Sequence, residues 1–291
     1  MIIILNLLNL KTILVHGGAF HPDDVCVVAF LKLCMNENRS LDIIRDYSPP
    51  SDSDAEAIGM LVADIGNGMF DHHAVPKETR QNGVAYAAFG KVVRAYWKES
   101  GLFKSESVYS RFDQNFIQEL DEFDNEGPQV LKGVKQHLGY IISNFNPKWN
   151  EDNTPARQMV QFQKAVELAM SIIQNEIRTA ESEILAEVII KEKVSEAKHG
   201  ILMLEEDIDY QSALEDTDIN WVIMPSPRGG WNAISVLDSE GKNKALFPDK
   251  FRGRPATELQ NICPGMLFCH SSGFMAQFEN KDQACAAVGS I

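Results

Sequence analysis

The sequence predicts an α/β protein in which a doubly wound, mostly parallel sheet is joined through a helical linker to a smaller α+β domain. Three observations predict this class. Short apolar segments alternate with helix-like segments in the first part of the chain. A long, charged, helix-favouring stretch follows a break rich in asparagine and proline, and short apolar runs resume from His199.

The elements of the first domain follow from apolar spacing. Short, mostly apolar runs, which are typical of buried strands, occupy residues 11–16, 41–45 and 59–66. Helical apolar spacing occupies residues 23–35, 83–99 and 108–123. Strands that alternate with helices favour a parallel sheet, and such sheets bind ligands at the carboxyl ends of their strands.

The rest of the chain divides at the segment 144–155, where asparagines and prolines interrupt the pattern. Thr154 and Pro155 suit the N-cap and first position of a helix that we expect to run to about Glu196. We therefore predict an N-terminal α/β domain, a helical linker and a smaller α+β domain, with the boundaries 1–145, 146–198 and 199–291.

Composition restricts the class of protein. The 291 residues are 44% hydrophobic and 23% charged, which predicts a packed globular chain, and the net charge of -14 disfavours broad attraction to duplex nucleic acid or anionic membranes. Five cysteines without CxxC pairing indicate reduced thiols and a cytoplasmic protein. The apolar start MIIILNLLNLK lacks a basic region and a cleavage site, so we expect neither secretion nor a membrane anchor.

Histidines and aspartates gather at the ends of the predicted strands and at one helix. The stretch HGGAFHPDD follows the first strand, and MFDHHAV follows the third. If the strand ends share one edge, these side chains converge where this class binds ligands. The candidates are His16, His21, Asp23, Asp24, Asp64, Asp71, His72 and His73, with Asp121 and Asp124 from the later helix.

Histidines and carboxylates without thiolates suit Mn²⁺, Mg²⁺, Fe²⁺ or Zn²⁺. The candidates outnumber the ligands that a single ion needs, which predicts two divalent ions. Paired ions bridged by a carboxylate can activate water for in-line attack on phosphorus. The pattern therefore indicates a dinuclear site for phosphoester hydrolysis.

Each segment also has a simpler reading. Asp23 or Asp24 would serve as a helix cap, Gly17-Gly18 as a tight turn, and His72-His73 as surface or core histidines. Four such segments at strand or helix ends are improbable as four independent accidents. The metal site is the reading that accounts for them together.

The second domain carries a local excess of basic residues between 225 and 260. Arg228, Arg252 and Arg254 could grip a phosphate backbone, and a solvated surface is the alternative. Trp231 could stack on a base, although an aromatic residue there is more often part of a core. His270 and Ser271 could donate to a phosphate oxygen, and a buried, hydrogen-bonded histidine is the alternative. Serine catalysis is disfavoured because no GxSxG motif occurs.

These residues resemble the DHH phosphoesterase superfamily, whose name matches Asp71-His72-His73. The ordered set HGGAFHPDD, VADIG, FDHH, ELDEFDN, FNPKW and CPGMLFCHSSGF is similar to the melanocyte proliferating gene exonuclease family, formerly described as metal-dependent protein hydrolases. The resemblance covers roughly residues 12–290. The late segment GFMAQFENK lacks the Gly-Gly-His substrate motif of many DHH nucleases, which leaves the substrate class open.

The resemblance implies two divalent ions, commonly Mn²⁺, and 3′-to-5′ exonuclease activity on RNA. It implies that Asp64 bridges the ions, that Asp71 orients His72, and that His73 faces the scissile phosphate. The implied metal ligands are His16, His21, Asp23, Asp64 and His72, with Asp24 also possible and with Asp121 or Asp124 completing the second ion.

We therefore expect a metal-dependent phosphodiesterase that trims single-stranded RNA or short oligonucleotides. The alternatives are a small-molecule phosphohydrolase acting on pyrophosphate, a cyclic dinucleotide or a nucleotide, and a non-catalytic metal- or RNA-binding protein. The oligomeric state is open, with a homodimer as one option.

Overall fold

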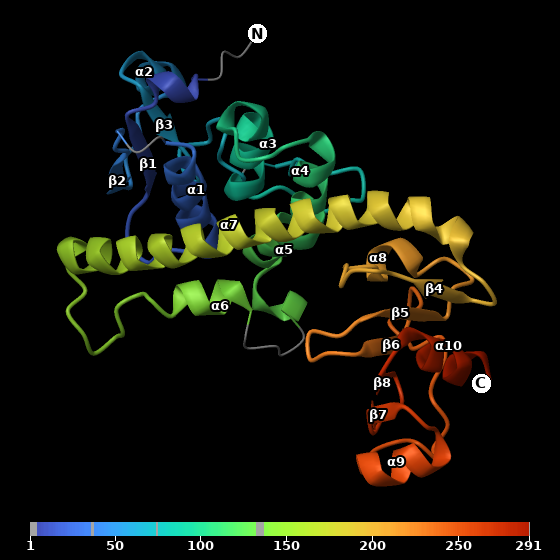
Figure 1. Cartoon of the computed structure of the whole chain (residues 1–291). Coiled ribbons are helices and arrows are strands. Elements are labelled where there is room, and N and C mark those ends of the chain that lie inside the picture. The colour runs from blue at the N-terminus through green and yellow to red at the C-terminus, as the bar shows by residue number, and fades with distance from the viewer. Residues whose placement is uncertain (1–4, 36–37, 74, 132–136, 291) are drawn as a thin grey trace. The chain divides into compact units, whose positions relative to one another are not determined.

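The computed structural model describes residues 5–35, 38–73, 75–131 and 137–290. Two compact units, Met1–Glu181 and Ser182–Ile291, divide the chain inside one long helix. Figure 1 shows the elements of both units. Among the described residues, no helix combines the length and hydropathy that crossing a bilayer requires.

The first unit holds a three-stranded parallel sheet in the order β2-β1-β3 and the helices that cover it (Figure 1). The elements are η1 (Leu7–Asn9), β1 (Thr12–His16), α1 (Pro22–Leu33), β2 (Asp42–Asp46), α2 (Asp52–Ala57), β3 (Met60–Val62), α3 (Ala88–Ser100), α4 (Glu106–Phe112), the π-helical turn η2 (Asp113–Ile117), α5 (Gln118–Glu126), η3 (Pro128–Leu131), α6 (Leu138–Ser143) and α7 (Pro155–Lys193).

The central strand β1 explains the parallel sheet. Ile13 lies opposite Ile43 of β2 and Leu61 of β3, and both Ile13 and Val15 are fully buried. Leu14 points to the opposite face, where it packs with Ala55 of α2 and Val62. The α/β class and the parallel strands are confirmed, while the sheet of the described residues is narrower than the predicted doubly wound sheet.

Helix α1 is the buried centre of the first unit. Pro22 occupies its first turn, and apolar residues from Val25 to Leu31 have no exposed surface. Helices α3, α5 and α6 pack against it. Because α1 starts directly after the loop that follows β1, its first turn lies at the carboxyl edge of the sheet.

The predicted long helix is observed as α7, with an apolar stripe at helical spacing. Phe162, Val166, Ala169 and Ile173 are fully buried in its first half, and Ile190 joins a core cluster of the second unit. The predicted helix 108–123 is divided, because the π-helical turn η2 separates α4 from α5.

The second unit contains a mixed five-stranded sheet in the order β4-β5-β6-β8-β7, in which β4 pairs with β5 in parallel and each later pair of neighbouring strands is antiparallel. Its core includes Trp221, Phe247 and Phe278. The elements are η4 (Val194–Glu196), β4 (Ile201–Met203), α8 (Gln211–Leu214), β5 (Trp221–Pro225), β6 (Trp231–Ser235), α9 (Ala256–Ile262), β7 (Met266–Cys269), β8 (Met275–Phe278) and α10 (Lys281–Gly289).

Candidate metal centre

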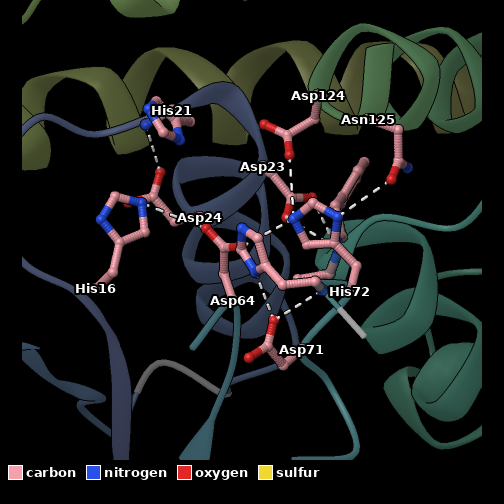
Figure 2. A network of polar contacts seen from close by, with 12 residues as sticks. His16, His21, Asp23, Asp24, Asp64, Asp71, His72, Asp124 and Asn125 are labelled. Carbon is pink, nitrogen blue, oxygen red and sulfur yellow. Dashed lines mark hydrogen bonds and ion pairs between the residues drawn. The ribbon is translucent and has the colours of Figure 1, made fainter. Parts of the chain in front are cut away.

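Asp64 occupies the middle of the histidine and aspartate cluster at the carboxyl edge of the parallel sheet (Figure 2). It follows β3 by two residues and is only 3% exposed. Its backbone has a φ of 60°, in the left-handed region that aspartate and asparagine tolerate better than most residues. A hydrogen bond from its N–H to the carbonyl of Phe70, at 3.0 Å, holds this conformation.

The two carboxylate oxygens of Asp64 face two different histidines. Oδ2 lies 3.3 Å from Nε2 of His16, and Oδ1 lies 3.0 Å from Nε2 of His72 (Figure 2). One carboxylate thus connects the loop after β1 with the segment after Phe70. A carboxylate whose two oxygens face different histidines offers one oxygen to each of two neighbouring groups of potential ligands.

The first group of potential ligands is formed by His16, His21 and Asp64, which each offer an atom within 4.8 Å of the others. The Nδ1 atom of His16 lies 2.8 Å from the carbonyl oxygen of Gly17, so its Nε2 atom faces the cluster. Asp24 lies alongside, with Oδ2 3.4 Å from Nε2 of His16.

Two buried atoms here, Nε2 of His16 and Oδ2 of Asp24, have only ion-pair contacts of 3.3 to 3.4 Å and form no hydrogen bond of good geometry within the described chain. Asp24 also caps α1, because its other oxygen, Oδ1, accepts the backbone N–H of His21 at 2.9 Å. An unsatisfied buried carboxylate oxygen is costly unless a cation or a donor reaches it. The residues present therefore fit a divalent cation.

The second group is formed by Asp23, His72 and Asp124. Nε2 of His72 lies 3.1 Å from Oδ2 of Asp124 and 3.9 Å from Oδ2 of Asp23. Asp23 does not cap its own helix, since its carboxylate accepts the backbone N–H groups of Ala88 and Phe89 at the start of α3, at 2.9 and 2.6 Å. These bonds hold Asp23 against the cluster.

Asn125 is a site residue that the sequence analysis did not identify. Its Oδ1 atom lies 3.3 Å from Nδ1 of His72, and its Nδ2 atom donates to the carbonyl of Asp121 at 2.9 Å. The second bond sets the orientation of the amide, so Oδ1 accepts from Nδ1 and leaves Nε2 of His72 free to bind a cation. Asn125 is the last residue of the quoted motif ELDEFDN, which was the available signal.

Asp71 contacts His73, whereas the family resemblance implied that it orients His72. Its Oδ1 atom lies 2.6 Å from Nδ1 of His73 and accepts the backbone N–H of His73 at 3.1 Å. His73 is 62% exposed, with Nδ1 3.9 Å from Oδ1 of Asp64. His73 therefore lies at the rim of the cluster, where a substrate can reach it.

Asp121 belongs to a separate ion pair. Its Oδ2 atom accepts from Nη2 of Arg80 at 2.7 Å, and its Oδ1 atom accepts the N–H of Gly90 at 3.1 Å. Arg80 also pairs with Asp113 at 2.6 Å. Of the two alternatives for the second ion, the structure places Asp124 beside His72, while both oxygens of Asp121 are occupied elsewhere.

The protonation of the cluster reflects its burial and its crowded charges. Burial acts to lower the pKa of His16 and His72, but hydrogen bonds and the charges of neighbouring aspartates outweigh it and raise these values to about 9 and about 11. Burial acts to raise the pKa of Asp64, but hydrogen bonds from the same histidines lower it to about 2. Burial raises the pKa of Asp24 to about 7, and burial with the charge of Asp124 raises that of Asp23.

These directions describe a site that needs positive charge. Without cations, protons on His16 and His72 balance the buried carboxylates. Divalent ions can replace those protons and leave both imidazoles neutral, which is the form in which histidine binds metals.

The loop between β1 and α1, which joins His16 to the helical turn of Asp24, is tied to a distant segment by Asn146. The side chain of Asn146 accepts the N–H of Phe20 at 2.9 Å and donates to the carbonyl of Phe20 at 2.8 Å. Phe20 also packs edge-on against Phe162 of α7, with ring centroids 5.4 Å apart. The motif FNPKW, which contains Asn146, thus positions the first ligand loop, a role that its sequence did not indicate.

The predicted substrate residues lie in the second unit, and two of its arginines have acidic neighbours. Nη1 of Arg252 lies 2.7 Å from Asp249, and Nη1 of Arg254 lies 3.0 Å from Glu258. Arg228 lies in the turn between β5 and β6. His270 is half-buried, with Nδ1 2.8 Å from Oγ of Ser272, and Ser271 is exposed beside it. Trp231 is a partly buried residue that packs against the core of this unit.

Fold and site together define an α/β protein whose clustered histidines and mostly buried aspartates can hold metal ions at the carboxyl edge of a parallel sheet. The family comparison makes this class specific. A family model described as MYG1 exonuclease, uncharacterised protein family UPF0160, matches residues 12–289, and the chain belongs to this family.

The relatives resemble the chain over most of its length. The MYG1 exonuclease of Rattus norvegicus is 24% identical over 326 residues, covering 96% of this chain and 84% of the rat protein. The MYG1 protein of Schizosaccharomyces pombe is 26% identical, covering 92% and 93%. That of Chlamydia pneumoniae is 25% identical, covering 96% and 95%. No solved structure matches the chain at a significant level.

Proposed function

We propose that this protein is a metal-dependent phosphodiesterase of the DHH type that removes nucleotides from the 3′ end of single-stranded RNA or short oligonucleotides. The observation that carries the proposal is Asp64, whose two oxygens face His16 and His72 at 3.3 and 3.0 Å. The exonuclease names of the mammalian relatives support a nucleic-acid substrate.

Two divalent ions, with Mn²⁺ as the leading candidate, would occupy the two groups. His16, His21 and Asp24 would hold one ion, while Asp23, His72 and Asp124 would hold the other, with Asp64 between them. Such ions supply Lewis acidity, which acidifies water and neutralises charge on the phosphate oxygens.

The protein's own groups would direct the reaction. Water would attack phosphorus in line with the bond to the 3′ oxygen of the remaining strand and lose a proton, while that bond breaks, the 3′ oxygen takes up a proton and a nucleoside 5′-monophosphate leaves. Asp71 accepts from Nδ1 of His73 at 2.6 Å, so in the imidazolium form the Nε2–H group of His73 would donate to the phosphate or give its proton to the departing 3′ oxygen.

The wider organisation completes the proposal. Residues 1–145 would carry the metals, 146–198 would connect, and 199–291 would bind substrate through Arg228, Arg252, Arg254, His270 and Ser271. The protein would act in the cytoplasm.

The test uses purified protein with Mn²⁺, Mg²⁺, Zn²⁺ or a chelator, and end-labelled RNA, DNA, pyrophosphate and cyclic dinucleotides. We expect Mn²⁺-dependent shortening of RNA from the 3′ end and loss of at least about 100-fold in kcat in Asp64→Asn. Asparagine is chosen because it tolerates the left-handed backbone at this position.

Asp42→Asn is the matched control, because Asp42 is an exposed carboxylate at the opposite end of the same sheet. Hydrolysis of pyrophosphate or dinucleotides alone would replace the proposal with small-molecule phosphohydrolysis. Cation or RNA binding without turnover would indicate a non-catalytic binding protein.

A further inference from the structure

Tyr47 is an exposed aromatic residue next to the first group of metal ligands. It follows β2, which lies beside β1 in the sheet (Figure 1), and 71% of its surface is exposed. Asp46 forms the turn that presents it, because its Oδ1 atom accepts the N–H groups of Tyr47 and Ser48 at 2.6 and 3.1 Å.

The ring of Tyr47 lies against the backbone of Gly17 and Gly18. A Cβ atom at Gly17 would approach Cε2 of the ring to 3.0 Å, and one at Gly18 would overlap the phenol oxygen. Gly18 also has a φ of 77°, which disfavours other residues. The two glycines of HGGAFHPDD therefore make room for the ring one residue from His16.

The surroundings hold the ring and the glycine turn together. Nη2 of Arg45 donates to the carbonyl of Gly18 at 2.8 Å, and its guanidinium lies 4.6 Å from the ring centre of Phe162. On the other side, Pro49 lies close enough to Gly66 that a Cβ there would meet its Cγ at 2.8 Å. The segment 46–50 thus packs against both loops that bring ligands to Asp64.

A ring that served only to cover the glycine turn would gain most by burial, yet Tyr47 keeps most of its surface open. An exposed aromatic surface held at fixed distance from a phosphate-cleaving centre is the feature on which bases stack. We propose that Tyr47 stacks on a nucleobase of the bound strand and so strengthens binding of the strand beside the first group of metal ligands. This inference rests on the proposed nuclease function and adds a substrate-binding residue to it.

The experiment compares wild type, Tyr47→Phe and Tyr47→Leu. The probe is an oligoribonucleotide with 2-aminopurine at its 3′ end and a phosphorothioate in the terminal linkage, which slows cleavage, and quenching of the fluorophore reports stacking. We expect wild type and Tyr47→Phe to quench alike, and Tyr47→Leu to bind about 5- to 10-fold more weakly with little quenching. Trp149→Leu is the control, because among the described residues of this unit Trp149 is a second strongly exposed aromatic residue, at 97%.

Kinetics on unmodified RNA separates stacking from a structural role. We expect Tyr47→Leu to raise KM by a similar factor with kcat nearly unchanged, and to equal wild type on strands with abasic sites at the two 3′-terminal positions. The stacking inference would be overturned if Tyr47→Leu left quenching and KM unchanged, or if Trp149→Leu lost as much quenching and affinity as Tyr47→Leu. In either case, hydrolysis of RNA by the wild type would still uphold the nuclease proposal. Absence of hydrolysis by wild type would instead overturn the nuclease proposal and, with it, this role for Tyr47.

Discussion

At the scale of single residues, the site depends on which oxygen or nitrogen each side chain leaves free. Asp24 uses one oxygen for its helix cap and keeps the other for the cluster. Asp64 keeps both oxygens for histidines. Asp121, from the same helix as Asp124, has neither oxygen free. A carboxylate's partners, rather than its presence in a motif, decide whether it can bind a cation.

Asp121 and Asp124 can be separated by the same substitution at each position. In Asp124→Asn we expect weaker Mn²⁺ binding with little change in stability, because Asp124 lies beside His72. In Asp121→Asn we expect unchanged Mn²⁺ binding but a loss on the order of 2–4 kcal/mol in the free energy of unfolding, because the buried Arg80 loses one charged partner. Titration calorimetry and denaturant unfolding measure both quantities, and the reverse pattern would contradict this assignment.

Asn125 offers a second test at this scale. Replacing it with alanine removes the oxygen that faces Nδ1 of His72, so we expect cation affinity to fall by about 10- to 100-fold. Asn125→Asp keeps an oxygen at that position and should retain more of the affinity. Equal Mn²⁺ affinity in wild type and Asn125→Ala would show that Asn125 does not orient His72.

At the scale of elements, apolar spacing predicted strands and helices well where burial follows the local pattern. The strand 11–16 and the helix 23–35 correspond to β1 and α1 within one or two residues. The helix 108–123 fails as a single element because η2 interrupts it. Asp113, the first residue of η2, pairs with Arg80, which lies 33 positions away and which apolar spacing does not reveal as its partner.

The loop between β1 and α1 is the element whose order matters most to the site. Asn146 satisfies both the N–H and the carbonyl of Phe20 in that loop. In Asn146→Ala we expect a loss of about 1–3 kcal/mol in the free energy of unfolding, since these backbone groups lose their partners. Because this loop joins His16, at the end of β1, to the first turn of α1, where Asp24 lies, Mn²⁺ affinity should fall as well.

Thermal unfolding and Mn²⁺ titration of Asn146→Ala measure these effects. Lys148→Ala is the neighbouring control, because its exposed ammonium group donates to the carbonyl of Asn144 instead of to the ligand loop. A variant that lost stability but bound Mn²⁺ with wild-type affinity would show that the Asn146 contact supports the fold without positioning the ligands.

At the scale of the whole molecule, stability and metal binding are coupled through protons. The folded-state pKa of His16, about 9, exceeds its ordinary value of 6.5, so its contribution to stability is complete below pH 6.5 and is lost as pH rises through about 9. The folded-state pKa of Asp24, about 7, also exceeds its ordinary value of 3.8, so its contribution to stability likewise falls as pH rises between those two values. The lowered pKa of Asp64 acts oppositely, since its contribution is lost as pH falls from 3.8 through about 2.

We therefore expect this cluster to lower the melting temperature of chelator-treated protein progressively as pH rises from 5 to 9. Mn²⁺ must displace the same protons, so the increase in melting temperature on adding Mn²⁺ should grow with pH. Calorimetric scans with chelator and with Mn²⁺ at pH 5.5, 7 and 8.5 measure this. An increment independent of pH would mean that the ions do not compete with protons on these side chains.

The sequence was sufficient for the α/β class, for most elements of the first unit and for the gathering of His16, Asp64 and His72, because strand ends, glycine turns and apolar spacing are local properties of the chain. Only the tertiary structure decided that Asp124 rather than Asp121 faces His72, that Asp71 contacts His73, and that Asn125, Asn146 and Tyr47 surround the ligands. Those choices depend on which distant groups meet in space, and a hydrogen bond between residues 126 positions apart leaves no periodic trace along the chain.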